Sequence, residues 1–273
     1  MNKLLMIILI NLLLIIGNIN GEEIKEPGKI PFVELNKNNL ITLRGVIDND
    51  ATADLVRKMN KFTGSQLYFY ITSPGGSVIE GMQIIDQIKS ISERNIKLYC
   101  IADFAASMAF AIFQSCPHRY VTSSSILMQH QMSLGIKGNL HNVNNYLEFI
   151  KQIDLDLDQL QAERIGLELD IFKNKIMNDW WLNGKNILLN KAADSFVVVS
   201  CNPELVDLSE ELNKITPIIE LQVVFSKCPI SREPISMIVK TKFDLLSDEK
   251  INQVIADVLP SKFISKLTNS ISI

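Results

Sequence analysis

The sequence predicts an α/β protein: a parallel sheet with crossover helices, followed by a small α+β appendage. Strand-like and helix-like runs alternate between residues 40 and 121, which is typical of parallel strands joined by helices. A single long helical stretch follows at 139–165. After Cys201 the pattern changes to a helix-like piece and a hairpin. We therefore expect a main domain at 22–201 and an appended module at 202–273.

The first half of the chain supplies the alternating elements. Leu40–Leu43 predicts a short strand and Gly45–Asp50 a turn, while apolar residues from Ala51 to Phe62 recur at helical spacing. Aromatic and β-branched residues predict a strand at 66–72, which the proline and two glycines of 73–76 would end. The remaining elements expected are a helix at 77–91, a strand at 96–102, a buried helix at 105–113 and a strand at 119–121.

The second half begins with the long helix expected from Asn139 to Ile165. Its apolar residues recur at helical spacing with charges between them, the pattern of a helix buried along one side. Beyond Cys201, Pro203 opens an acidic helix-like piece, and a turn at 228–234 separates two strand-like runs, which predicts a hairpin. The other elements expected are a helix at 170–182, a strand at 196–199, hairpin strands at 220–225 and 236–242, and a helix at 247–259 before Pro260.

The composition is that of a globular protein. The 273 residues are 47% hydrophobic and 21% charged, so the chain is long enough to bury one full core. The formal net charge is −3 and the pI is about 5.7. Because there is no basic stripe of the kind that phosphate binding needs, we exclude nucleic acid as a partner.

The first residues have the order of a secretory signal. Lys3 provides a positive start, Leu4–Ile16 is apolar apart from Asn11, and the small polar run 17–21 precedes an acidic pair. We predict a signal peptide at 1–21 and export to the periplasm, the exterior or the endoplasmic-reticulum lumen. The alternative is an uncleaved anchor that leaves the protein membrane-associated, although a span needs about 20 apolar residues.

Four cysteines lie at spacings that match no zinc site, and we expect neither a metal nor another cofactor. Behind a signal peptide, an oxidising compartment lets cysteines pair. Four cysteines allow three connectivities, of which we favour Cys100–Cys116 with Cys201–Cys228. The alternative is that some of them are small buried apolar side chains.

Three short segments carry residues suited to chemistry. Ser73–Ser77, with the sequence SPGGS, follows a strand, and its glycines can leave backbone N–H groups open to a ligand. Ser107 lies at the start of a predicted helix in the segment AASMA, and His130 is a candidate for the base that a serine nucleophile requires. Each also has a plain interpretation: a turn, a helix N-cap and a solvated histidine.

In this order, these segments resemble the proteolytic subunit of the Clp protease family. The resemblance covers Leu40–Val199 and includes the opening LITLRGVIDNDATA at 40–53, the AASM segment at 105–108 and the His-Gln pair at 130–131. It implies the spiral core of repeated β-β-α units that this family shares with crotonases, with 139–165 as its long handle helix. It also implies self-association, with a ring as one form.

The resemblance implies a serine endopeptidase that hydrolyses peptide bonds in peptides or unfolded proteins through an acyl-enzyme. Ser107 would be the nucleophile, His130 the general base and Asp179 the residue that orients the imidazole. The N–H groups of Gly76 and Met108 would form the oxyanion hole. An exported relative would have no access to the cytosolic unfoldase that serves the family.

The chain also departs from the family pattern. Asp103 stands where the family commonly has glycine, four residues before Ser107, so its carboxylate could weaken activity. Met132 replaces a proline, and the segment 190–194 differs although Asp194 remains.

Three other interpretations fit parts of the sequence. One is a Ser–Lys dyad as in signal peptide peptidase A, with Lys151 as the base. Another is an acyl-CoA enzyme of the crotonase type, which shares the fold and the oxyanion hole. The third is a non-catalytic ring subunit or scaffold. Members of that kind normally lose Ser, His or Asp, whereas this chain keeps all three.

Overall fold

The computed structural model describes residues 30–215, 219–241, 252 and 255. The expected signal peptide at 1–21 lies outside these ranges. So does the helix expected at 247–259, apart from residues 252 and 255.

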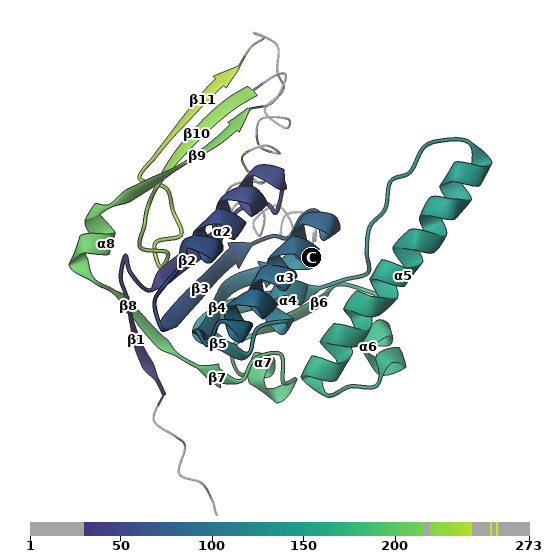
Figure 1. The fold of residues 1–273 in the computed structure, drawn as a ribbon, viewed down its shortest axis with the longest axis horizontal. Helices are drawn as coiled ribbons and strands as arrows, with labels where there is room; N and C mark the ends of the chain where they lie inside the picture. Colours follow the sequence, from purple (N-terminus) through teal and green to yellow (C-terminus); the bar gives the residue numbers. More distant parts are fainter. Residues whose placement is uncertain (1–29, 216–218, 242–251, 253–254, 256–273) are drawn as a thin grey trace, which may run out of the picture. The chain divides into compact units, whose positions relative to one another are not determined.

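The core is a six-stranded sheet whose first four strands are parallel neighbours in the order β2-β3-β4-β5. Helices α2, α3 and α4 cover one face of it (Figure 1). This confirms the predicted α/β class and the parallel sheet. The elements are β2 (Leu40–Arg44), α2 (Asn49–Lys61), β3 (Gln66–Ser73), α3 (Val78–Glu93), β4 (Lys97–Ala106), α4 (Met108–Gln114) and β5 (His118–Gln129).

Two further strands complete the sheet beyond β5. β6 (Trp180–Asn183) pairs antiparallel with the end of β5, and β7 (Ser195–Phe196) pairs parallel with its start. A separate parallel pair, β1 (Phe32–Leu35) with β8 (Val198–Cys201), packs with Tyr70 and Ile101 of the sheet. The sheet therefore has apolar packing on both faces, as a parallel sheet requires.

The long helix α5 (Leu140–Ile165) begins at Asn139, whose side chain accepts a hydrogen bond from the Asn142 N–H, and ends at Gly166 in the left-handed conformation. Its C-terminal half packs against α4 and α6 (Leu169–Lys175), and α7 (Lys185–Leu189) follows β6. Its N-terminal half extends away from the sheet (Figure 1) and exposes Leu140 and Phe149.

The chain after Cys201 forms a second, smaller sheet. Helix α8 (Pro203–Asp207) leads into β9 (Ser209–Ile215), which pairs antiparallel with β10 (Ile219–Ser226). β10 pairs antiparallel with β11 (Ser236–Thr241). Alternate residues of β10 are buried, which gives this sheet its own apolar side.

Three expectations about elements are wrong. The helix expected at 105–113 begins only at Met108, because β4 continues to Ala106. The helix expected at 170–182 ends at Lys175, and Trp180–Asn183 is a strand, because pairing with β5 and packing of Trp180 on Phe172 outweigh local periodicity. The strand expected at 196–199 is broken into β7 and β8.

Candidate active site

Ser107 lies at the junction between β4 and α4 in a strained conformation. Its φ of 56° and ψ of −125° are rare for a residue with a side chain. Ser107 occupies the N-cap position of α4, but its hydroxyl makes no capping bond to the helix. A sharp strand-to-helix turn of this kind presents a nucleophile above the sheet.

His130 follows β5 and contacts the Ser107 hydroxyl. Its Nε2 lies 2.9 Å from Ser107 Oγ. The Ser107 N–H donates to the Met128 carbonyl at 2.9 Å, and the His130 N–H donates to the Gln129 side chain at 3.1 Å. Because a backbone bond holds Ser107 against β5 and His130 directly follows that strand, the sheet brings the two side chains together.

Asp179 reaches the other side of the imidazole through β6. Gln129 pairs with Trp180, so the antiparallel register places Asp179 beside His130. Asp179 Oδ1 lies 3.8 Å from His130 Nδ1, beyond hydrogen-bond distance but close enough for an ion pair with a protonated imidazole. The carboxylate is partly exposed. This strand was missed from the sequence, although Asp179 itself was named.

The glycines of the segment 73–77 place a backbone N–H next to Ser107. Gly75 has φ +97°, and an added Cβ would lie 2.7 Å from the Ala106 carbonyl and 2.8 Å from Ser107 Cβ. Gly76 has φ +148°, and its Cβ would lie 2.3 Å from the Ile47 carbonyl. Only glycine fits both positions. Both glycines belong to the segment singled out from the sequence, whereas the contact of Gly76 with Ile47 was not expected.

The N–H groups of Gly76 and Met108 make no hydrogen bond within the described ranges. Both residues line the same cavity as Ser107 and His130, which has a volume of about 320 Å³. The cavity also includes Met132, the residue that departs from the family's proline. The cavity therefore brings together a hydroxyl in contact with an imidazole and two unbonded N–H groups, the groups that acyl-transfer chemistry requires.

A family model described as Clp protease matches residues 26–189, more than half of the chain. The chain belongs to the Clp protease family. The resemblance drawn from the motifs is confirmed, and membership makes this chain a relative of serine-type peptidases that act on peptides. The match ends at residue 189, so the module expected at 202–273 lies beyond it.

The first departure from the Clp protease pattern, Asp103, forms an ion pair. In the strand register, Asp103 has no partner residue on either neighbouring strand. Ala102 and Phe104, on either side of it, pair with both β3 and β5. Its buried carboxylate binds Arg232, with Nε to Oδ2 at 2.7 Å and Nη2 to Oδ1 at 2.5 Å. Asp103 lines a cavity with Arg232, apart from the one at Ser107. The position that is commonly glycine in the family is therefore a bulge in β4. Its aspartate pairs with an arginine 129 residues further along the chain.

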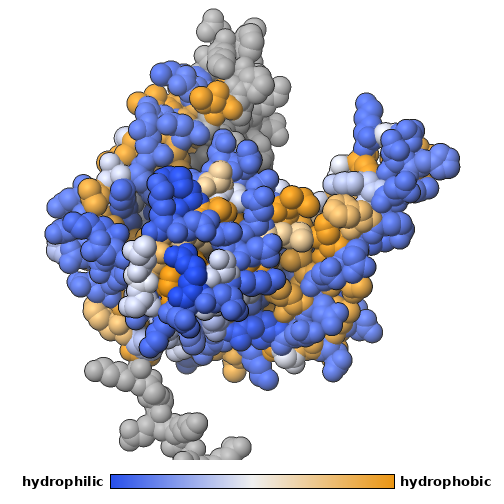
Figure 2. Space-filling model, in the orientation of Figure 1, coloured by the Kyte–Doolittle hydropathy of each residue, from blue (hydrophilic) through white to orange (hydrophobic). Residues whose placement is uncertain are grey.

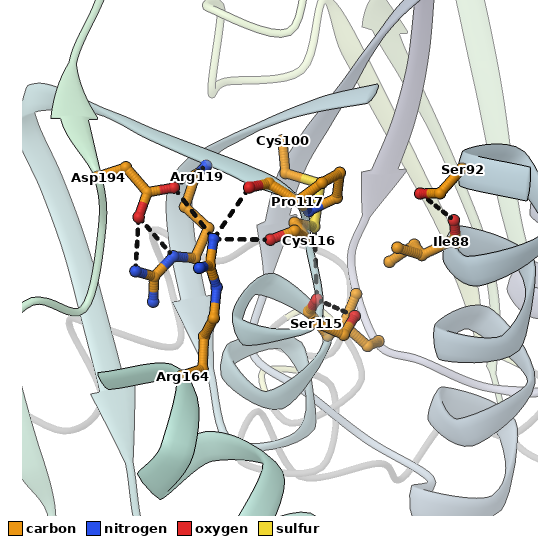
Figure 3. Close-up of a disulfide and its surroundings, with 10 residues drawn as sticks. Ile88, Ser92, Cys100, Ser115, Cys116, Pro117, Arg119, Arg164 and Asp194 are labelled. Atoms are coloured by element: carbon orange, nitrogen blue, oxygen red, sulfur yellow. Dashed lines mark hydrogen bonds and ion pairs between the residues drawn. A yellow bond between two sulfur atoms is a disulfide. The ribbon is translucent and has the colours of Figure 1, made fainter. Parts of the chain in front are cut away.

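Asp194, which is retained although the segment 190–194 departs from the family pattern, links α5 to the sheet (Figure 3). Its carboxylate accepts hydrogen bonds from Arg119, at 2.6 Å from Nη2, and from Arg164, at 3.2 Å. Burial alone would raise the pKa of Asp194, but the hydrogen bonds and charges of the two arginines outweigh it and hold that pKa below its usual value. Arg164 also donates to the Cys116 carbonyl.

Two disulfides are present, Cys100–Cys116 and Cys201–Cys228. The first links β4 to the end of α4, beside the hydrogen bonds that Asp194 accepts from Arg119 and Arg164 (Figure 3). The second links the end of β8 to the turn after β10. That turn also contains Arg232, so the smaller sheet is joined to the core by a covalent bond and an ion pair.

The lysine of the alternative Ser–Lys dyad lies away from Ser107. Lys151 is exposed on α5, where it pairs with Glu148 at 2.7 Å, and it is not part of the cavity at Ser107.

Over the described ranges, no helix is long and apolar enough to cross a bilayer. The same ranges hold no group of three or more histidine, cysteine, aspartate or glutamate side chains suited to a metal ion.

Proposed function

We propose that this protein is a serine endopeptidase that hydrolyses peptide bonds through a Ser107–His130–Asp179 triad. The observation that carries the proposal is the strained Ser107, whose Oγ lies 2.9 Å from His130 Nε2 in a cavity with two unbonded N–H groups. Strain at a nucleophile is retained only where the surrounding structure enforces it. Membership of the Clp protease family supports the same chemistry.

In the first half of the reaction, Ser107 Oγ attacks the peptide carbonyl while its proton passes to His130 Nε2. The negative charge that develops on the carbonyl oxygen is stabilised by the N–H groups of Gly76 and Met108. The C–N bond then breaks, and the imidazolium returns its proton to the leaving amine. In the second half, His130 takes a proton from a water molecule whose oxygen attacks the acyl carbon. The ester bond to Ser107 then breaks, Ser107 Oγ takes the proton back from His130, and the acid is released.

Asp179 stabilises the imidazolium and keeps Nδ1 directed toward β6. The distance of 3.8 Å fits this role, because catalytic contacts are often longer without substrate and shorten when a substrate excludes water. Asp103 is not expected to disturb the reaction, since Arg232 balances its charge outside the cavity.

The exposed half of α5 supports self-association, and we propose a homo-oligomer of the ring type typical of the family. Leu140, Tyr146 and Phe149 expose 43–70% of their surfaces along this helix. Ile79 and Met82 of α3 are also exposed, and Figure 2 shows apolar surface between the core and α5. Contiguous apolar surface of this kind marks protein interfaces.

We further propose that the protein is exported. The two disulfides support an oxidising compartment, and the order of residues 1–21 supports a signal peptide. An exported protein would not meet the cytosolic unfoldase that serves the family. The proposed substrates are therefore peptides and proteins that are already unfolded, and the appended module, of which Cys228 and Arg232 are joined to the core, has an accessory role.

Hydrolysis of an unfolded protein such as reduced casein by the purified full chain tests the proposal. We expect activity that falls by at least about 10⁴-fold in Ser107→Ala and in His130→Ala. Lys151→Met is the matched control and keeps full activity. Loss of activity in Lys151→Met with retention in His130→Ala would contradict the triad and favour a Ser–Lys dyad.

A further inference from the structure

The cavity at Ser107 has two carboxylates on the side formed by α5. Asp154 and Asp158 lie one helical turn apart, so their side chains share one face of the helix. Both line the cavity, and Asp158 is only 6% exposed. None of the described residues that line this cavity is a lysine or an arginine.

The Asp158 carboxylate has no hydrogen-bond donor among the described residues. The nearby amide groups donate elsewhere: Gln129 to Gln161, and Gln161 to the Leu157 carbonyl at 2.9 Å. Burial raises the pKa of Asp158 to about 6, with a further contribution from Asp154. At neutral pH the cavity therefore contains a buried negative charge, which Lys173 attracts but to which no cation among the described residues forms a hydrogen bond.

The rest of the cavity suits an aliphatic chain. Its apolar wall is made by Met108, Ala111, Met128 and Leu157. The carbonyl that Ser107 attacks belongs to the residue before the scissile bond, and that residue's side chain leaves the adjacent Cα. A side chain that enters here passes the apolar wall and can place its tip at the carboxylates.

We propose that this cavity is the specificity pocket and that it favours peptides with lysine or arginine immediately before the scissile bond. A long aliphatic stem with a cationic tip satisfies the apolar wall and the carboxylates together. The inference rests on the proposed function, because it assigns the cavity to the substrate of that reaction. Asp158 is the principal specificity residue and Asp154 adds to its charge.

The preference is expected to decline as the pH falls through about 6, where Asp158 takes up a proton. The charged and titratable groups around Asp158 are Asp154 on α5, His130 after β5 and Lys173 on α6. Any effect of pH on the Ser107–His130 pair acts on both substrates alike. The ratio of rates for two substrates at the same pH therefore isolates the contribution of the carboxylates.

The test compares peptides that differ only in arginine or citrulline before the scissile bond, since citrulline has the same shape without the charge. We expect the wild-type protein to cleave the arginine peptide at least about tenfold faster in kcat/KM. In Asp158→Asn we expect this ratio to approach one. Asp156→Asn is the matched control, because Asp156 is exposed on the same helix, hydrogen-bonds Gln152 and lies outside the cavity.

Binding to Ser107→Ala separates this inference from the proposed function. Fluorescence anisotropy of the two labelled peptides needs no catalysis, and we expect at least about tenfold tighter binding of the arginine peptide. Tighter binding together with absent hydrolysis in wild type would support the pocket and count against the peptidase. Equal affinity, or an equal kcat/KM in an active enzyme, would overturn the inference.

Discussion

The ion pair between Asp103 and Arg232 leads to a quantitative prediction about Arg232→Met. This substitution keeps the apolar stem but leaves the Asp103 carboxylate, whose side chain is 4% exposed, without its cation. Removing one partner of a fully buried pair costs about 3–5 kcal/mol. Because the Arg232 side chain is 44% exposed and water screens it, we expect a smaller loss, about 2–3 kcal/mol of unfolding free energy.

Urea unfolding followed by circular dichroism measures this loss, together with Asp103→Asn and the double variant. The double variant should recover part of the stability, because no charge is then left buried alone. Arg57→Met is the matched control: its partner Asp54 is exposed on α2, so the cost should stay below about 0.5 kcal/mol. A loss in Arg232→Met no larger than in the control would refute the reasoning.

Three further predictions concern the glycine turn, the first disulfide and Asp158. Gly75→Ala should reduce kcat/KM for peptide hydrolysis by about 100-fold or more, because the added Cβ would displace an oxyanion donor. Gly135→Ala is the control and should leave kcat/KM unchanged, since a Cβ added there meets nothing within 4 Å. Replacing the Cys100–Cys116 disulfide by two alanines should cost about 3 kcal/mol in urea unfolding, given its separation of 16 residues, and an unchanged midpoint would contradict this. Asp158→Asn should raise stability at pH 7 by up to about 3 kcal/mol but leave it unchanged near pH 4. The folded state holds the Asp158 proton up to about pH 6, so wild-type stability falls as the pH rises from 4 to 7. Thermal unfolding of both proteins across pH 4–7 measures this difference, and the same dependence of stability on pH in wild type and variant would contradict it.

The sequence predicted those parts of the molecule that depend on neighbouring residues. The strands and helices between residues 40 and 121 follow from local periodicity. Ser107 was named because it lies at a predicted strand-to-helix junction, and His130 because a serine nucleophile needs a base and the His-Gln pair matches the family's motif. The backbone at those points is set locally by glycines and small side chains.

The parts that the sequence did not predict depend on distant partners. The strand at Trp180–Asn183 exists through its pairing with β5, and β1 and β9 were missed because short or polar strands show little alternation. Arg232 is far from Asp103 in the chain, so nothing local connects them. Asp158 looks like a solvated helix charge until the packing of α5 shows that it is buried.

Labelling with a fluorophosphonate probe tests whether His130 activates Ser107, because only an activated serine reacts. We expect one adduct in the purified full chain, located on Ser107 by peptide mass spectrometry. The adduct should be absent in Ser107→Ala and in His130→Ala, and retained in Lys151→Met. A folded wild-type protein that takes up no probe, or an adduct that persists in His130→Ala, would contradict the claim that Ser107 and His130 act as a catalytic pair.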